Sequence, residues 1–202
     1  MHAAAAVGFA GMAEDRDASA LDARGVHLIH RVAEGDREAL VEIYRAYQRP
    51  LFAYLRRMTP DQGLAEELLQ DTLVAAWQSA RSFEARSSVQ TWLFGIARRQ
   101  AHNSLRRRGI AVQSDDALAE VVDADPSPEA VALARADSSA LAGAVAQLSP
   151  IHREVLVLKF VNGLSYEEMA LVVGVPEGTI KSRLNAARKA LRRLAANGEP
   201  GE

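Results

Sequence analysis

The sequence predicts an all-α protein of two small helical domains joined by a flexible acidic linker. Between its few prolines, the 202-residue chain is rich in Ala, Leu, Arg and Glu, a composition that favours helices. Apolar residues recur at helical spacing, and no convincing strand of period two is found. Charge divides the chain, because residues 111–147 carry seven acidic side chains and one basic side chain, whereas both flanking segments have more bases than acids.

The first domain is predicted over residues 26–108, after a frayed tail over residues 1–25. The tail is Ala-rich but has no basic start, which favours a tail over a secretory signal peptide. Apolar positions between Leu40 and Leu55 indicate one or two helices. The next two helices show continuous apolar faces, formed by Ala65, Leu68, Leu69, Thr72, Leu73 and Ala76, and by Leu93, Ile96, Ala97, Ala101 and Leu105.

Residues 109–136 are predicted to form the linker. They contain the helix-breaking run Pro126-Ser127-Pro128 and no basic residue between Ile110 and Arg135. Such a charged, proline-containing segment favours an extended tether. In the free protein, this linker is expected to fold back on the basic helices.

The second domain is predicted over residues 137–197 and contains a helix-turn-helix. Ser149 is expected to cap a helix that continues to residue 161, with Pro150 at its first position. Ser165 opens a capping box with Glu168, and that short helix ends at Gly174. A second helix follows from residue 176 to about residue 196, and two helices joined by a short turn are typical of duplex-DNA binders.

The last helix is basic, with six bases and no acid between Gly178 and Gly198. Its apolar seam centres on Ile180, Leu184 and Leu191. The opposite face offers small and amide side chains that can approach base edges, and flanking bases that can reach phosphates. A solvated basic helix is the alternative. The predicted DNA-facing residues are Gly178, Lys181, Ser182, Arg183, Asn185, Ala186, Arg188 and Lys189.

Two further surfaces are predicted in the first domain. The outer face of helix 64–79 is acidic and suits a basic protein partner, although an ordinary solvated surface is the alternative. It presents Glu66, Glu67, Gln70, Asp71, Val74 and Gln78. The segment 83–92 and the helix after it combine bases, amides and aromatics, which fits single-stranded nucleic acid; the alternative places Trp92 and Phe94 in the core.

Several function classes are excluded or disfavoured. The chain has no cysteine, which excludes disulfides, thiolate zinc sites and cysteine nucleophiles. No apolar run is long enough for a membrane span, so a cytoplasmic protein is expected. His27 and His30 could be a metal pair, but surface or core histidines are favoured. With no glycine-rich phosphate loop or nucleophile elbow, neither an enzyme nor a cofactor is expected.

Two blocks of residues stand out by their order and spacing. The first comprises residues 65–72 (AEELLQDT), Trp77 and residues 86–98. The second comprises residues 148–150, 165–170 and 175–184. Together they resemble the second and fourth domains of extracytoplasmic-function (group 4) sigma factors of bacterial RNA polymerase, over about residues 26–196. A free-standing helix-turn-helix regulator of duplex DNA is the alternative.

The resemblance implies a role for each predicted surface. The acidic helix would dock on the clamp coiled coil of the largest subunit of core polymerase, through Glu66, Glu67, Gln70, Asp71 and Val74. The polymerase flap would be a further contact, and the linker would run toward the RNA exit path. The melted minus-ten strand would meet Arg86, Ser87, Ser88, Gln90, Trp92, Arg98, Arg99, His102 and Asn103.

The minus-thirty-five duplex would meet the basic helix, through Gly178, Thr179, Lys181, Ser182, Arg183, Asn185, Arg188 and Lys189. Family members often carry a base where this chain has Ala186 and a larger group where it has Asn185. The resemblance also implies control by an anti-sigma factor. It implies neither a small-molecule substrate nor insertion into a membrane.

Overall fold

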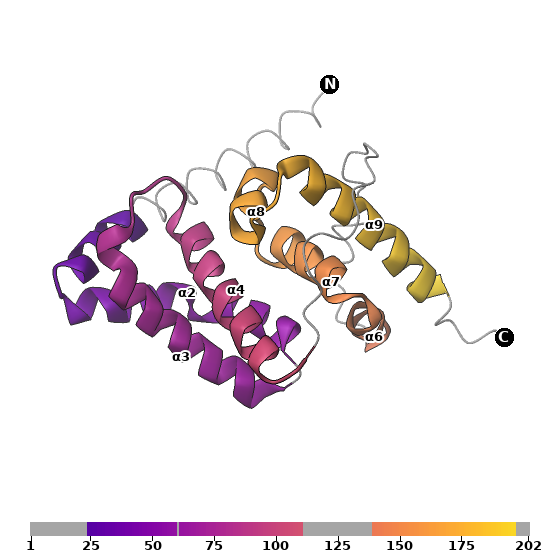
Figure 1. Cartoon of the computed structure of the whole chain (residues 1–202), viewed down its shortest axis with the longest axis horizontal. Coiled ribbons are helices and arrows are strands. Elements are labelled where there is room, and N and C mark those ends of the chain that lie inside the picture. Colours follow the sequence, from indigo (N-terminus) through magenta and orange to yellow (C-terminus); the bar gives the residue numbers. More distant parts are fainter. Residues whose placement is uncertain (1–23, 60, 111–138, 197–202) are drawn as a thin grey trace, which may run out of the picture.

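The computed structural model describes residues 24–59, 61–110 and 139–196, and every regular element in these ranges is a helix (Figure 1). The all-α prediction is therefore confirmed. Most of the predicted tail and linker, and with them the proposed folding back of the linker, lie outside the described residues. None of the helices in the described ranges is long and apolar enough to cross a membrane.

The N-terminal module, residues 24–110, is built around three long helices. A helical stretch over residues 24–33 leads into α2 (Arg37–Met58). Helix α3 (Gln62–Ser79) and the short 3₁₀ helix η1 (Ala80–Ser82) follow, and α4 (Val89–Arg107) completes the module. Helices α2, α3 and α4 pack against one another around one apolar core.

Helix α2 is a single helix, which resolves the choice between one and two helices in this region. Pro50 lies inside it, where its ring removes one backbone hydrogen bond. The apolar face nevertheless continues across the proline, because Tyr47, Leu51 and Tyr54 are all buried. Tertiary packing of this face compensates for the missing hydrogen bond.

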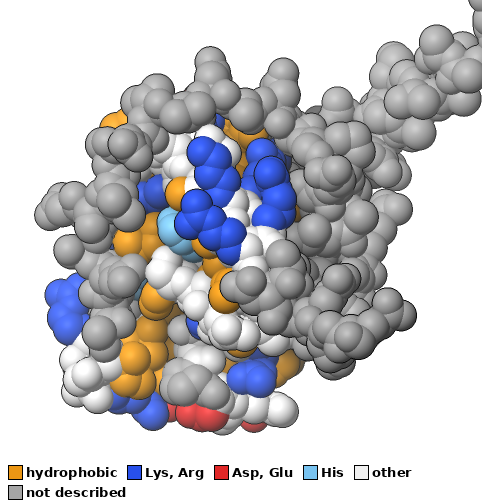
Figure 2. Space-filling model, turned by 90° about the vertical axis from the view of Figure 1, so that its right-hand side faces the viewer, with side chains coloured by type: hydrophobic (Ala, Val, Ile, Leu, Met, Phe, Trp, Pro, Cys, Tyr) orange, Lys and Arg blue, Asp and Glu red, His pale blue; other side chains and the backbone are white. Residues whose placement is uncertain are grey.

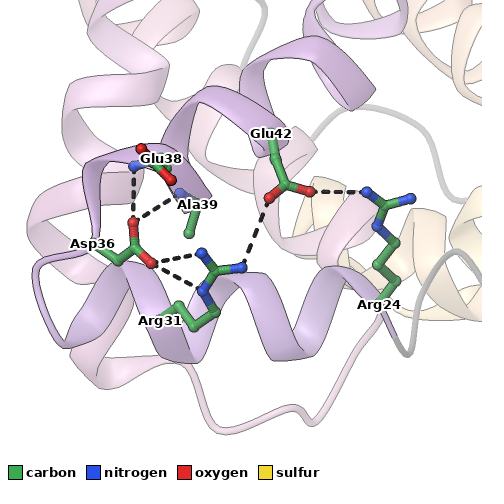
Figure 3. Close-up of polar contacts among 6 residues, drawn as sticks. All are labelled: Arg24, Arg31, Asp36, Glu38, Ala39 and Glu42. Atoms are coloured by element: carbon green, nitrogen blue, oxygen red, sulfur yellow. Dashed lines mark hydrogen bonds and ion pairs between the residues drawn. The ribbon is translucent and has the colours of Figure 1, made fainter.

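A cluster of charges fixes the helical stretch 24–33 to α2 (Figure 3). Asp36 caps α2, and its other oxygen accepts hydrogen bonds from Arg31 at 2.9 and 2.6 Å. Hydrogen bonds from the backbone of Ala39 and from Arg31 lower the pKa of Asp36. Glu42 of α2 pairs with Arg24 at 2.8 Å and lies 3.7 Å from Arg31. These contacts set the angle at which the chain enters α2.

The C-terminal module, residues 139–196, is formed by α6 (Ser139–Gln147), α7 (Pro150–Leu156), α8 (Tyr166–Val173) and α9 (Glu177–Ala196). The predicted start of α7 is confirmed, since the Ser149 hydroxyl accepts from the backbone N–H of His152 at 3.3 Å. Both hydrogen bonds of the predicted capping box of α8 are present. Helix α9 packs on α6, α7 and α8 through the predicted apolar seam.

One local feature of this module was not predicted. Helix α7 continues as a π-helical turn, η2 (Val157–Val161), whereas the sequence suggested a regular helix to residue 161. The backbone N–H and side-chain amide of Asn162 both donate to the carbonyl of Val157, each at 3.1 Å. The wider turn ends the helix at Asn162, just before the loop that leads to α8.

The two modules pack side by side. Helix α4 lies against α8, as Figure 1 shows, and α2 contacts α7 and the π turn. The part of the N-terminal module that was predicted to hold single-stranded DNA therefore faces the first helix of the helix-turn-helix. This packing decides which predicted site residues are accessible.

The turn of the helix-turn-helix offers a test of its backbone. Gly174 ends α8 in the left-handed conformation, φ 78°, and a Cβ there would meet nothing within 4 Å. Gly174→Ala is therefore expected to destabilise the protein through backbone strain alone, by about 1–2 kcal/mol. Gly143 also has open space but lies inside helix α6, so Gly143→Ala should stabilise by up to about 1 kcal/mol. Urea unfolding of both variants checks the opposite signs, and equal shifts would contradict the assignment.

Candidate nucleic-acid interfaces and docking face

The outer face of α3 carries the predicted polymerase-docking residues, and all of them are exposed. Asp61 caps the helix by accepting from the backbone of Leu64 at 2.8 Å, and Leu64 and Leu68 turn the opposite face into the core. Val74 is 55% exposed, which makes it an apolar contact point within an acidic surface. The exposed residues of this face are Glu66, Glu67, Gln70, Asp71 and Val74.

The charges of this face are held by weak, solvated contacts. Glu67 pairs with Arg108 at the end of α4, with 3.0 Å between the two side chains and both about half exposed. Glu66 accepts from Gln62 at 2.8 Å within α3. Such exposed pairs contribute little to stability, so a basic partner could replace them at low cost.

The loop before α4 begins the predicted minus-ten surface. Ala85 has a left-handed backbone, φ 52°, which turns the chain sharply just before the polar run. Arg86 is exposed and pairs with Glu84 at 2.6 Å. Ser88 caps α4, because its hydroxyl accepts from the backbone N–H of Thr91 at 3.1 Å. Ser87 lies between them and is half-buried.

The aromatic residues of α4 divide between core and surface. Phe94 is fully buried and meets Tyr54 edge-on, with 5.3 Å between ring centroids. Trp92 is partly buried and packs on Phe83 at 5.0 Å. The core alternative is thus confirmed for Phe94, while Trp92 keeps an edge at the surface. Beyond them on α4, Arg99 and Asn103 are exposed and His102 is half-buried.

Three of the predicted minus-ten residues are half-buried and contact the C-terminal module. Arg98 donates through Nε to Glu154 of α7 at 3.0 Å. The Ser88 hydroxyl donates to Glu168 of α8 at 2.9 Å. The side-chain amide of Gln90 donates to the backbone carbonyl of Asn162 at 2.9 Å.

The Glu154 carboxylate is the most buried charge among these contacts. It is 3% exposed and accepts from the Tyr54 hydroxyl at 2.7 Å as well as from Arg98. Burial, together with the neighbouring carboxylate, raises the pKa of Tyr54 well above its usual value. The phenol therefore keeps its proton and acts as a donor to Glu154.

Glu168 is shared between two helix starts. One oxygen accepts from the backbone N–H of Ser165 at 2.9 Å, and the other from Ser88 and Thr91, both at 2.9 Å. Burial alone would raise the pKa of Glu168, but hydrogen bonds from Ser165, Thr91 and Ser88 outweigh it and lower the pKa. The carboxylate thus stays ionised between the positive ends of α4 and α8.

Helix α9 presents a mixed surface at the predicted minus-thirty-five site. Gly178, Lys181 and Lys189 are exposed, and Thr179, Asn185 and Arg188 are half-buried. Lys181 pairs with Glu177 at 2.9 Å on the helix surface. Figure 2 shows Lys and Arg side chains gathered around a histidine on the side of the molecule where α6 and the C-terminal half of α9 lie.

Two of the predicted duplex-binding residues are buried in this arrangement. Ser182 is 8% exposed and donates to the carbonyl of Thr179 at 3.0 Å, and Arg183 is 3% exposed. Burial and the nearby Arg183 lower the pKa of His152 on α7. The guanidinium of Arg188 packs over the ring of Phe160 at 5.4 Å. Ser182, Arg183 and Arg188 therefore pack within the C-terminal module, although the sequence placed them on the DNA face.

Sequence reasoning missed Tyr54, Glu154 and Glu168 as groups that connect the two modules. Tyr54 falls on the apolar face of α2, and Glu168 was explained by the capping box alone. Glu154 could have been noticed in the sequence only as a single acidic residue directly before the apolar run Val155–Leu158. Its partners are 56 and 100 residues away in sequence, so spacing could not reveal them.

Arg153 is a further missed residue, and it joins the C-terminal ends of α6 and α2. Its guanidinium donates to the carbonyl of Ala146 in the last turn of α6 at 2.6 Å, and to the carbonyl of Leu148 just after α6 at 3.0 Å. It also donates to the carbonyl of Arg57 in the last turn of α2 at 3.3 Å. A cation at helix C-termini is electrostatically favourable. Burial lowers the pKa of Arg153, but the group stays charged.

The two histidines considered for metal binding lie on the surface of the N-terminal module. His27 and His30 are both exposed on the helical stretch 24–33. Within the ranges that the structure describes, no group of three or more His, Cys, Asp or Glu side chains is placed to hold a metal ion.

Comparisons with known proteins match both modules. Residues 43–110 match the family described as Sigma-70 region 2, and residues 138–191 match Sigma-70, region 4. The chain is 34% identical over 154 residues to the ECF RNA polymerase sigma factor SigL of Mycobacterium tuberculosis, covering 74% of this chain and 85% of the relative. It is 31% identical over 175 residues to the RNA polymerase sigma-H factor of Pseudomonas aeruginosa, covering 81% and 90%.

A solved structure agrees with these relatives. The sigma factor RpoE of Bartonella quintana, determined in complex with the anti-sigma factor NepR, is 33% identical with a TM-score of 0.58. The match covers 77% of this chain and 97% of that one. Because both modules match sigma-70 regions, the alternative of a free-standing helix-turn-helix regulator is not favoured. The chain therefore belongs to the extracytoplasmic-function sigma factors of bacterial RNA polymerase, non-enzymatic subunits that act in transcription initiation.

Proposed function

We propose that this sigma factor divides promoter recognition among three surfaces. The outer face of α3 docks on the clamp coiled coil of the largest polymerase subunit. The loop 86–88 and the adjoining face of α4 hold the melted minus-ten strand, and α9 meets the minus-thirty-five duplex. The domain boundaries proposed for these roles are residues 26–108 and 137–197, with the intervening residues as the linker.

The observation that carries the proposal is the separation of charge between exposed helix faces. The α3 face is acidic, whereas α4 ends on the exposed bases Arg106, Arg107 and Arg108, and α9 exposes Lys181, Lys189, Arg192 and Arg193. An acidic face suits a protein partner, and basic faces suit nucleic acid. The exposed apolar side chains Val161 and Leu171 of the C-terminal module are available to the polymerase flap.

Within the minus-ten surface, the roles follow from side-chain chemistry. Arg86 and Arg99 are exposed cations that can pair with phosphates, and Asn103 is an exposed amide that can bond to a base edge. Trp92 is a partly exposed aromatic residue on which a base can stack. Ser87, Ser88, Gln90, Arg98 and His102 complete the surface once they are accessible.

Within the minus-thirty-five surface, the order in which residues are proposed to contact DNA follows their solvent exposure. Gly178, Lys181 and Lys189 are exposed, so they are the first contacts proposed. Thr179, Asn185 and Arg188 follow, and Ser182 and Arg183 contribute only after local rearrangement, because both are buried here. Asn185 is the proposed base reader, since an amide can pair with adenine in the major groove.

We further propose cytoplasmic control by an anti-sigma factor. Support comes from the RpoE relative, whose structure holds an anti-sigma factor, and from the matching two-module architecture of this chain.

Promoter-directed transcription with core polymerase tests the proposal directly. Addition of this protein to core enzyme is expected to give a product that starts at a fixed position on a cognate promoter, found by selection from random DNA. Core enzyme alone supplies the control. Failure to bind core polymerase, or binding without any promoter-dependent product, would contradict the proposed function.

The duplex contact of α9 has its own test. Lys189→Ala is expected to weaken duplex binding for all sequences alike and to lower the slope of log affinity against log salt by about 0.9, the release of one counterion. Fluorescence anisotropy over a salt series measures this slope. Arg37→Ala makes the same change in charge on an exposed site of the other module and should leave the slope unchanged. An unaltered slope for Lys189→Ala would remove this side chain from the phosphate contacts.

A further inference from the structure

We propose that Phe160 of the π turn positions Arg188 of α9 for contact with one phosphate of the minus-thirty-five duplex. The inference rests on the duplex-binding role proposed for α9, and it adds a positioning residue that the sequence did not predict. Phe160 lies in η2 and packs, partly buried, against the apolar core. The fold therefore fixes this ring before DNA binds.

The ring and the guanidinium form a cation–π contact. The guanidinium of Arg188 lies over the Phe160 ring, with 5.4 Å between Cζ and the ring centroid, which is within the range where this attraction is effective. Helix α9 packs on α7 and so brings the two side chains together. Because a planar guanidinium stacks on an aromatic face in a defined way, Phe160 restricts the orientations that Arg188 can adopt.

The guanidinium also has donors to spare. Nε and Nη2 of Arg188 are both buried, and neither has a hydrogen-bond acceptor within the ranges that the structure describes. A buried donor of a charged group that lacks an acceptor is unfavourable, and an aromatic ring offsets only part of that cost. An anion that reached this side chain would therefore be bound favourably.

Arg188 lies on the flank of α9 that is predicted to reach phosphates. Lys181 comes seven residues earlier, about two helical turns away, so both side chains leave α9 on the same side. Lys181 is exposed, whereas Arg188 is half-buried and keeps a part that is accessible to a phosphate. Because water is partly excluded around Arg188, its attraction for a phosphate is stronger than that of a fully solvated cation.

Lys181 shows the solvated counterpart of this arrangement. Its ammonium lies 5.5 Å from the centroid of the Tyr166 ring, but it also pairs with Glu177 at 2.9 Å, and both side chains are about half exposed. Lys159 lies over the same ring at 5.0 Å. An exposed and paired ammonium gains little from a ring. We therefore expect the larger effect of an aromatic residue at Arg188.

A positioned guanidinium loses less conformational entropy when it binds a phosphate. An arginine side chain has many rotamers, and restricting them at the moment of binding costs free energy. Stacking on Phe160 restricts Arg188 beforehand. The number of counterions released depends on the charges that meet, and this number is the same with or without the ring. Phe160 should thus raise the affinity for duplex DNA and leave its salt dependence unchanged.

Duplex binding by the full chain tests this role. Fluorescence anisotropy over a salt series measures binding to a labelled mixed-sequence duplex of two helical turns. Phe160→Leu removes the ring, Phe160→Tyr keeps it, and Arg188→Ala removes the cation. Tyr44→Leu is the control, because Tyr44 is an aromatic residue that is 40% exposed on α2 of the other module. Circular dichroism shows which variants fold, and Phe160→Met is a second ringless variant if Phe160→Leu does not.

Phe160→Leu is expected to lower duplex affinity about fivefold at the salt slope of the parent protein, and Phe160→Tyr should bind as the parent does. Arg188→Ala should lower affinity about tenfold and the slope by about 0.9. In a chain that already carries Arg188→Ala, Phe160→Leu should change affinity by less than about twofold, because the ring then has no cation to position. Tyr44→Leu should have no effect.

The outcomes separate this inference from the proposed function. An equal effect of Phe160→Leu with and without Arg188 would overturn the positioning role, and so would weak binding by folded Phe160→Tyr. If Lys189→Ala lowers the salt slope but Arg188→Ala does not, α9 still binds the duplex and only the Arg188 contact is wrong. If neither variant lowers the slope, the minus-thirty-five assignment of α9 is overturned, and the role of Phe160 with it.

Discussion

Asp71→Arg is expected to lower the affinity for core polymerase on the order of 100-fold, about 2.7 kcal/mol. Asp71 is exposed near the centre of the acidic face of α3, beside Gln70 and Val74. The change replaces attraction for a basic partner by repulsion, and like charges brought together at an interface are strongly unfavourable. Titration of labelled protein with core enzyme measures the loss.

A matched charge reversal away from this face gives the control. Glu34 is exposed in the turn before α2, and Glu34→Arg changes the net charge by the same amount. It should leave core binding close to the parent value. Both variants should bind duplex DNA as the parent protein does, because α9 is untouched. Equal core affinities for Asp71→Arg and Glu34→Arg would place the docking face elsewhere.

Phe94→Ala should cost about 3–5 kcal/mol of the free energy of unfolding. Phe94 is fully buried in α4, and its ring meets Tyr54 edge-on. Removal of the ring leaves a cavity beneath the residue whose hydroxyl bonds to Glu154. The loss therefore reaches the module interface as well as the core, and urea unfolding monitored by circular dichroism measures it.

Leu171→Ala is the comparison for this core deletion. Leu171 is 58% exposed on α8, so its truncation should change stability by less than about 0.5 kcal/mol. The difference between the two variants isolates the effect of burial. A loss below 1 kcal/mol for Phe94→Ala would mean that the ring is solvated and available for stacking, as the single-strand interpretation of this segment required.

The helices of this protein are specified by local sequence signals. Ser149 with Pro150, and Ser165 with Glu168, satisfy the free N–H groups at two helix starts, and the structure contains both caps. Gly174 supplies the left-handed residue that ends α8. Apolar spacing correctly placed Ile180, Leu184 and Leu191 in the core. These signals act over a few residues, which is why a sequence alone reveals them.

Local sequence signals could not predict the π turn or the continuation of α2 as a single helix. Nothing in the run Val157–Val161 distinguishes a π turn from a regular helix, because the two differ only in which carbonyl each N–H meets. Pro50 predicts an interruption by local rules, yet α2 continues through it. In both cases, packing against other helices outweighs the local preference of the backbone.

The sequence by itself determined that the chain forms two helical modules, that their helices carry separate acidic and basic faces, and that one module holds a helix-turn-helix. Only the tertiary structure decided that Ser88, Gln90 and Arg98 meet the C-terminal module, and that Ser182 and Arg183 are buried. The physical reason is the separation in sequence between the interacting residues. Caps and apolar faces depend on neighbours within a few residues, whereas the Glu154 contacts join residues 56 and 100 positions apart. Such pairs become favourable only after folding has buried the carboxylate and brought its donors to it.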